Sequence, residues 1–206
     1  MRIGIDFDNT IACYEGVFHR AALIQELIPE TLETSKNAVR DYLNGSGRKD
    51  EFTILQGYVY GARMDLVEPY PGFAAFVSAA RAAGHELFVV SHKTKAPIMG
   101  PAYDLHEAAR GFLMNQGLVG EGAIAQSNVF FEVTKEDKVA RAAALGVDVF
   151  VDDLPEILGM SGFPASVRKI LFDPESYHAG KTGYETFSDW NAIGHALTGQ
   201  ADVLAQ

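Results

Sequence analysis

Short apolar segments alternate with longer amphipathic segments over most of this 206-residue chain, and this rhythm constrains the fold more than any other feature. The short segments are typical of buried strands, and in the longer ones apolar residues recur at helical spacing. Three of the helical segments stop at Gly84, Gly117 and Gly146, and glycine is typical of helix C-termini. Strands that alternate with helices predict βαβ units, so we expect an α/β fold with one parallel sheet and helices on both faces.

The rhythm places the expected elements along the chain. The expected strands cover residues 2–7, 86–90, 128–131, 147–151 and 168–172. The expected helices of the same rhythm cover residues 73–83, 103–115, 135–145 and 188–197, with Ser188 as the N-cap of the last one. This order of elements predicts a Rossmann-like parallel sheet.

Residues 12–68 interrupt the rhythm directly after the first expected strand. Over residues 14–43 the apolar residues recur at helical spacing, with a break near Pro29. Residues 52–64 are rich in aromatic residues and favour a helix without a clear spacing, and the turn-forming residues 69–72 close the stretch. We therefore expect a core made of residues 1–11 and 69–206, and a helical insertion made of residues 12–68.

Composition excludes several classes of partner and compartment. The net charge of −10 repels phosphate backbones, so we expect no nucleic-acid polymer as a partner. No apolar run reaches about 18 residues, and an acidic residue interrupts the first one, so neither a membrane span nor a secretory signal is expected. The single cysteine, Cys13, is read as a packing residue. We expect a cytoplasmic protein, monomeric or homodimeric.

Polar side chains stand where three of the expected strands end. The first strand ends at Asp6 and Asp8, the second is followed by Ser91, and the fourth by Asp152 and Asp153. Parallel sheets bind ligands outside the carboxyl ends of their strands, so four carboxylates and a hydroxyl are expected at one edge. Carboxylates gathered without a counter-charge repel one another, and Mg²⁺ together with phosphate oxygens of a ligand would relieve that repulsion.

These residues resemble the four-motif pattern of the haloacid dehalogenase-like (HAD) superfamily. The matching positions, in motif order, are Asp6, Asp8 and Thr10, then Ser91, then Lys138, then Asp152 and Asp153. Lys135 is a second candidate for the third motif. The resemblance covers nearly the whole chain outside residues 12–68, and it implies that this insertion is a helical cap.

The resemblance also implies a mechanism of phosphoryl transfer. Asp6 would attack phosphorus and become an aspartyl phosphate. Asp8 would protonate the leaving alcohol and then deprotonate the water that clears the intermediate, with Thr10 orienting it. Ser91 would hydrogen-bond a phosphoryl oxygen, and Lys138 would neutralise charge on the transferring group.

The resemblance implies Mg²⁺ as the cofactor. The ion would be bound by Asp6, by the backbone carbonyl of Asp8 and by an acid of the fourth motif. Of the two acids in that motif, Asp153 is the expected direct ligand and Asp152 the supporting one.

Three further residues are candidates for substrate contact beside Ser91 and Lys138. His92 and Lys93 follow Ser91 directly, and a purely structural role is equally open for His92. Arg63 lies in the insertion, where it could face the substrate or be a solvated surface residue.

An acid at position 8 is typical of superfamily members that act on oxygen leaving groups. The resemblance therefore implies a phosphatase acting on a small phosphorylated metabolite, either a nucleotide or a sugar phosphate. Residues 134–138 and 151–156, together with Trp190, are similar to 5′(3′)-deoxyribonucleotidases of the superfamily, which points to a nucleotide. Residues 91–95 and 103–106 depart from that group, so a sugar phosphate is equally open. A phosphomutase or phosphotransferase and a non-catalytic binding module are the alternatives.

Overall fold

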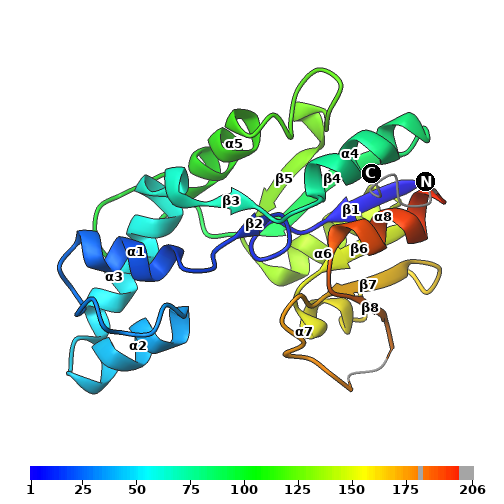
Figure 1. Cartoon of the computed structure of the whole chain (residues 1–206). Coiled ribbons are helices and arrows are strands. Elements are labelled where there is room, and N and C mark those ends of the chain that lie inside the picture. The colour runs from blue at the N-terminus through cyan, green and yellow to red at the C-terminus, as the bar shows by residue number, and fades with distance from the viewer. Residues whose placement is uncertain (181–182, 200–206) are drawn as a thin grey trace, which may run out of the picture. The chain divides into compact units, whose positions relative to one another are not determined.

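The computed structural model describes residues 1–180 and 183–199, and its contacts divide the chain into two units (Figure 1). The first, here called the sheet unit, comprises Met1–Ala12, Pro69–Lys93 and Met114–Gln206. The second, here called the helical unit, comprises Cys13–Glu68 and Thr94–Leu113. Within the described residues, no helix is both long and apolar enough to span a membrane.

The sheet unit contains a six-stranded parallel sheet, which confirms the predicted fold class. The strands lie in the order β5-β4-β1-β6-β7-β8, and each pair of neighbours runs parallel. Their bounds are Arg2–Ile5 for β1, Glu86–His92 for β4, Val129–Glu132 for β5, Val149–Asp152 for β6, Arg168–Phe172 for β7 and Glu185–Phe187 for β8. Strand β1 lies inside the sheet, with β4 and β5 on one side of it and β6, β7 and β8 on the other.

Helices cover both faces of the sheet. Successive side chains of a strand point to opposite faces, so each face has apolar side chains against which a helix can pack. On one face, Phe88, Phe150 and Leu171 join a buried apolar cluster with residues of α6 and α7. On the other, the ring of Phe172 stacks on the fully buried Trp190 of α8. The helices of this unit are α4 (Phe73–Ala82), α6 (Lys135–Ala144), α7 (Pro155–Leu158) and α8 (Trp190–Thr198), and the 3₁₀ turn Gln126–Asn128 lies directly before β5.

Gly4 of β1 leaves room for the ring of Phe150 on the neighbouring strand β6. It pairs with Phe150 across β1 and β6, and a Cβ atom at Gly4 would lie 2.7 Å from Cδ2 of that ring. Atoms cannot approach so closely, so any larger residue at position 4 would displace Phe150. The same ring lies beneath Lys138, with 5.7 Å between Nζ and the ring centroid.

The helical unit is built from α1, α2 and α3, the 3₁₀ turn η1 and most of α5. Their bounds are Val17–Ile24, Lys36–Gly45, Lys49–Ala62, Met64–Leu66 and Leu105–Asn115. Helices α1, α2 and α3 pack against one another, and the rings of Tyr14, Phe18 and Tyr60 meet edge to face among them. The short strands β2 (Ala12–Cys13) and β3 (Glu68–Pro69) pair where the chain passes from one unit to the other.

Residues 94–113, which the sequence placed in the core, belong by their contacts to the helical unit. The reason is a small-residue face on α3. A Cβ atom at Gly57 would lie 2.7 Å from Cβ of Pro97, and one at Gly61 would overlap the ring of Tyr103. The absent side chains therefore let the segment after β4 lie directly against the α3 backbone.

Two details of the C-terminal region differ from expectation. The N-cap of α8 is Asp189, whose side chain accepts a hydrogen bond from the main-chain N–H of Ala192, and not Ser188. The strand β8 was not expected, because Glu185, Thr186 and Phe187 form a short edge strand that is only partly buried. Its sequence therefore lacks the apolar run that marks the central strands.

Candidate active site

The candidate site lies at the carboxyl ends of the three central strands, where an open parallel sheet binds its ligands. Ile5 is level with Val89 of β4 and Val151 of β6, so the residues that follow these three positions share one edge. Asp6 comes directly after β1, and its main-chain N–H donates to the carbonyl oxygen of Val151 at 2.9 Å. The sequence prediction that three strands deliver polar groups to one edge is thus reproduced by the register.

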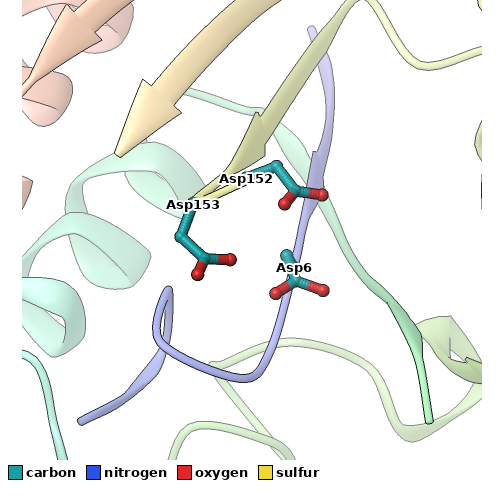
Figure 2. A group of neighbouring side chains, drawn as sticks. All are labelled: Asp6, Asp152 and Asp153. Carbon is teal, nitrogen blue, oxygen red and sulfur yellow. The ribbon is translucent and has the colours of Figure 1, made fainter. Parts of the chain in front are cut away.

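Three carboxyl groups gather at this edge (Figure 2). Asp6, Asp152 and Asp153 each offer an oxygen atom, and these atoms lie within 4.8 Å of one another. Asp6 is 4% exposed and Asp152 fully buried, whereas Asp153 is partly buried. The cluster combines the first acid of the first motif with both acids of the fourth motif.

Lys138 supplies the counter-charge within the cluster. Its Nζ lies 2.6 Å from Oδ1 of Asp6 and 2.6 Å from Oδ2 of Asp152. The lysine stands in the first turn of α6, which begins after Thr134, whose hydroxyl oxygen accepts from the main-chain N–H of Asp137. Lys138 is 1% exposed, so the α6 cap places a buried ammonium between two carboxylates that come from different strands.

Burial and mutual repulsion raise the pKa values of the two fourth-motif acids. Desolvation raises the pKa of Asp152 to about 6, and the charge of Asp6 adds to this effect while Lys138 opposes it. Desolvation and the charges of Asp6 and Asp152 hold the pKa of Asp153 well above its usual range. Burial lowers the pKa of Lys138, but the charges of Asp152 and Asp6 outweigh this and raise it above the ordinary value.

These residues fit a divalent cation. One ammonium faces three carboxylates, which leaves two negative charges to be balanced when all three acids are ionised. Carboxylate oxygens are the ligands that Mg²⁺ prefers, and the ion usually keeps waters and substrate phosphate oxygens as its remaining ligands. Asp153 is partly exposed, so solvent reaches this member of the cluster.

Thr10 and Ser91 are both buried near this edge of the sheet. The Oγ1 of Thr10 donates to Oδ2 of Asp6 across 3.5 Å, so this hydroxyl contacts Asp6 and not Asp8 in the hydrogen bonds described. The carbonyl oxygen of Thr10 accepts from Nε1 of Trp190 at 2.9 Å. Ser91 lies in β4, opposite Phe131 of β5, and is 1% exposed.

Asp8 is held by Lys93. The Nζ of Lys93 donates to both carboxylate oxygens of Asp8, at 2.9 and 2.7 Å. Lys93, a predicted substrate contact, thus has its ammonium paired with the second acid of the first motif.

Three predicted residues remain, and they are His92, Lys135 and Arg63. His92 is partly buried, and its pKa is lowered by desolvation and by the nearby charge of Lys138. Lys135 pairs with Glu156 at 2.6 Å on the surface, so Lys138 and not Lys135 contacts the carboxylate cluster. Arg63 belongs to the helical unit, where it pairs with Asp65 and donates to the hydroxyl oxygen of Tyr58.

Two contacts at the site were missed by the sequence interpretation. The Lys93–Asp8 pair joins residues 85 positions apart, and the Trp190–Thr10 hydrogen bond joins residues 180 apart. The sequence signal for the Lys93–Asp8 pair was a lysine two positions after Ser91, at the end of a buried strand. The Trp190–Thr10 hydrogen bond had no sequence signal, because its acceptor is a main-chain carbonyl.

No protein-family model matches this chain, and no curated protein sequence matches it either. Among solved structures, it is similar to a HAD family hydrolase from Deinococcus radiodurans R1 with bound phosphate and sodium, at 17% identity over 96% of this chain and 95% of that chain, with a TM-score of 0.61. A HAD-superfamily hydrolase of subfamily IA from Geobacter sulfurreducens PCA is 13% identical over 95% of both chains, with a TM-score of 0.59.

A third similar structure is a predicted phosphoglycolate phosphatase from Haemophilus somnus 129PT. It is 16% identical over 93% of this chain and 95% of that chain, with a TM-score of 0.53. Identities this low establish the fold and leave the activity to be argued from the site. The chain thus has the α/β fold of the HAD-superfamily hydrolases.

Proposed function

We propose that this protein is a Mg²⁺-dependent phosphatase that hydrolyses a small phosphate monoester through an aspartyl phosphate on Asp6. The observation that carries the proposal is the buried contact of Asp6 with Lys138 inside a cluster of three carboxylates. A purely structural core has little use for such an arrangement, because burying charges costs more than their pairing returns.

Asp6 is the nucleophile in this proposal. It directly follows the central strand, and Lys138 and Thr10 contact its two carboxylate oxygens, which fixes the orientation of the carboxylate. A fixed carboxylate can attack phosphorus in line without first losing rotational freedom. Lys138 then stabilises negative charge on the transferring phosphoryl group.

Asp8 is the acid and base. It protonates the oxygen of the leaving alcohol when Asp6 attacks, and it then takes a proton from the water that hydrolyses the aspartyl phosphate. Ser91, at the end of β4, is the proposed donor to a phosphoryl oxygen, and His92 is the next residue on the same strand.

Asp6 and Asp153 would hold Mg²⁺, with the backbone carbonyl of Asp8 as a further ligand and Asp152 in support. When bound, the ion supplies positive charge that offsets the carboxylates and the phosphate oxygens. The predicted activity of the Haemophilus somnus protein, a phosphatase, agrees with this class of reaction.

The proposed substrate is a small phosphorylated metabolite, a nucleotide or a sugar phosphate. The similarity of residues 134–138 and 151–156 to deoxyribonucleotidases supports the nucleotide, and the departure of residues 91–95 from that group keeps the sugar phosphate equally open. The helical unit would act as a cap that selects the substrate, with Arg63 as a candidate contact. The net charge of −10 argues against a nucleic-acid polymer as substrate.

The test is hydrolysis of an aryl phosphate by the purified protein, with and without Mg²⁺. We expect turnover that EDTA abolishes and that Asp6→Asn lowers by several orders of magnitude, because the amide cannot form the covalent intermediate. Asp148→Asn is the matched control, since Asp148 accepts from the main-chain N–H of Arg2 at the opposite edge of the sheet and should leave turnover unchanged.

A panel of nucleotides and sugar phosphates, run in parallel, identifies the substrate class. Folded, Mg²⁺-saturated protein that hydrolyses no member of the panel would refute the phosphatase. Transfer of the phosphoryl group to a second substrate instead of water would replace it with a phosphotransferase.

A further inference from the structure

A second buried lysine, Lys93, lies outside the carboxylate cluster. It is 5% exposed, and its ammonium donates to both oxygens of Asp8, at 2.9 and 2.7 Å. Its main-chain N–H donates to the carbonyl oxygen of Glu132 at 2.7 Å, which continues the pairing of β4 with β5. The position of the lysine is therefore set by the sheet itself.

The surroundings of the ammonium are apolar on one side. Its Nζ lies 5.5 Å from the ring centroid of Phe7, a residue that is fully buried and in edge-to-face contact with Phe131. Taking an ammonium out of water is unfavourable unless a carboxylate compensates it. The contact with Asp8 provides that compensation, so the two groups hold each other in place.

We propose that Lys93 is a positioning residue that fixes the carboxylate of Asp8 for the hydrolysis of the aspartyl phosphate, and that it does not bind substrate. The inference rests on the proposed function and deepens it. A substrate anion could reach Lys93 only by displacing Asp8, because the lysine side chain is 4% exposed whereas that of Asp8 is 26% exposed.

The step that Lys93 supports is the attack of water on the aspartyl phosphate. Asp8 takes a proton from water while the water oxygen bonds to phosphorus and the bond from phosphorus to the Asp6 oxygen breaks. Inorganic phosphate leaves, the Asp6 carboxylate is restored, and the proton on Asp8 is the one that protonates the next leaving alcohol. Each carboxylate oxygen has two lone pairs, so contact with one ammonium does not exhaust its capacity to accept a proton.

The experiment compares Lys93→Met, Lys93→Arg and wild type on an aryl phosphate, whose good leaving group makes formation of the intermediate easy. For Lys93→Met we expect kcat to fall by about 10- to 100-fold, because general base catalysis contributes on this scale or above. KM should fall with it and leave kcat/KM nearly unchanged, because only the hydrolysis of the aspartyl phosphate is slowed and its formation is not. A rapid burst of aryl alcohol, one per active site, should precede slow turnover. Lys93→Arg, which keeps the charge and the donors, should recover part of the loss.

The matched control is Lys169→Met. Lys169 is also a partly buried lysine on the sheet, but it stands near the start of β7, and its Nζ lies over the ring of Phe163. We expect its kinetics to match those of wild type. If Lys93→Met fails to fold, Lys93→Gln, which keeps a donor without the charge, gives the same comparison.

Each contrary outcome has a distinct meaning. A raised KM with unchanged kcat would overturn the inference and make Lys93 a substrate-binding residue. A lower active fraction with normal kcat per folded site and no burst would reduce Lys93 to a structural role. Wild-type protein that releases no phosphate would refute the proposed function itself, and the inference with it.

Discussion

The two units of the molecule place their charged groups differently. In the helical unit, the ion pairs described join near neighbours in sequence, as in Arg48–Glu51 and Arg63–Asp65, and each includes an exposed partner. In the sheet unit, Lys138 contacts Asp6 from 132 positions away, with both side chains at most 6% exposed.

The difference shows which charges carry information about function. Exposed pairs between sequence neighbours contribute about 0–1 kcal/mol and are common on any surface. Buried pairs between distant residues are retained against a desolvation penalty, so they need a reason beyond stability. The sheet unit also has exposed pairs, such as Arg168–Glu185, but its buried pairs gather at one edge.

The largest effect should come from removing the buried ammonium. We expect Lys138→Met to lower the free energy of unfolding by about 3–5 kcal/mol in EDTA, because Asp6 and Asp152 are left buried without their partner. Urea denaturation at neutral pH measures it, with Lys135→Met, which breaks only the exposed pair with Glu156, as the control. Equal losses of unfolding free energy in the two variants would show that burial does not set the contribution of these charges.

The next effect probes packing in the helical unit. We expect Gly61→Ala to lower the free energy of unfolding by about 1–3 kcal/mol, since the new methyl group overlaps the ring of Tyr103. Gly111→Ala in α5 is the matched control, because a Cβ atom there meets nothing within 4 Å. The control should gain about 0.5–1 kcal/mol from helix propensity. A stabilised Gly61→Ala would show that α3 has no need of its glycine face.

A smaller effect, of opposite sign, is expected at Asp153. Its pKa is raised by burial and by the charges of Asp6 and Asp152, so ionisation destabilises the metal-free folded state as pH rises. Asp153→Asn should therefore raise the free energy of unfolding in EDTA at neutral pH by about 1 kcal/mol, a typical gain where a functional site is relieved of strain.

The gain at Asp153 should vanish in acid, where the wild-type carboxyl group is protonated. The rise in Tm that Mg²⁺ gives the wild type should shrink in the same variant, because a ligand is lost. Thermal melts at two pH values, with and without the ion, measure both effects. An unchanged response to Mg²⁺ would remove Asp153 from the metal site.

The smallest effect concerns an exposed pair of the helical unit. The hydrogen bond from Arg63 lowers the pKa of Asp65, so the pair stabilises the fold above the ordinary Asp pKa and loses this contribution as pH falls through the lowered value. We expect Asp65→Asn to cost about 0.2–1 kcal/mol at neutral pH, with the difference disappearing in acid and shrinking in salt. A loss of unfolding free energy above this range that does not depend on salt would show that the pair behaves like a buried ion pair.

The sequence predicted the sheet and the acids gathered at its edge because both depend on local pattern. Apolar strands followed by acids at positions 6, 152 and 153 mark a ligand-binding edge whatever the rest of the chain does. The parallel order is a consequence of the βα rhythm, and the central position of β1 brings the marked strand ends together.

Features that depend on distant partners could not be predicted in this way. Residues 94–113 continue the βα rhythm, so nothing local indicates that they pack on α3. Gly57 and Gly61 lie on one face of that helix, and such spacing of glycine within a helix signals close approach by another segment without naming it. Likewise, Lys93 was recognised as a site residue, but its partner Asp8 emerged only from the pairing of β1 with β4.

Trp190 is the single tryptophan of the chain, and its position makes it useful beyond packing. Its indole is fully buried, lies against Phe172, and donates to the carbonyl oxygen of Thr10 in the loop that carries Asp8. The emission of an indole depends on its hydrogen bonds and on the rings around it. Selective excitation of Trp190 therefore reports on the backbone of this loop as well as on the rings packed around the indole. The protein thus carries an intrinsic fluorophore next to the loop that follows Asp6, and we expect its emission to change when a ligand binds there.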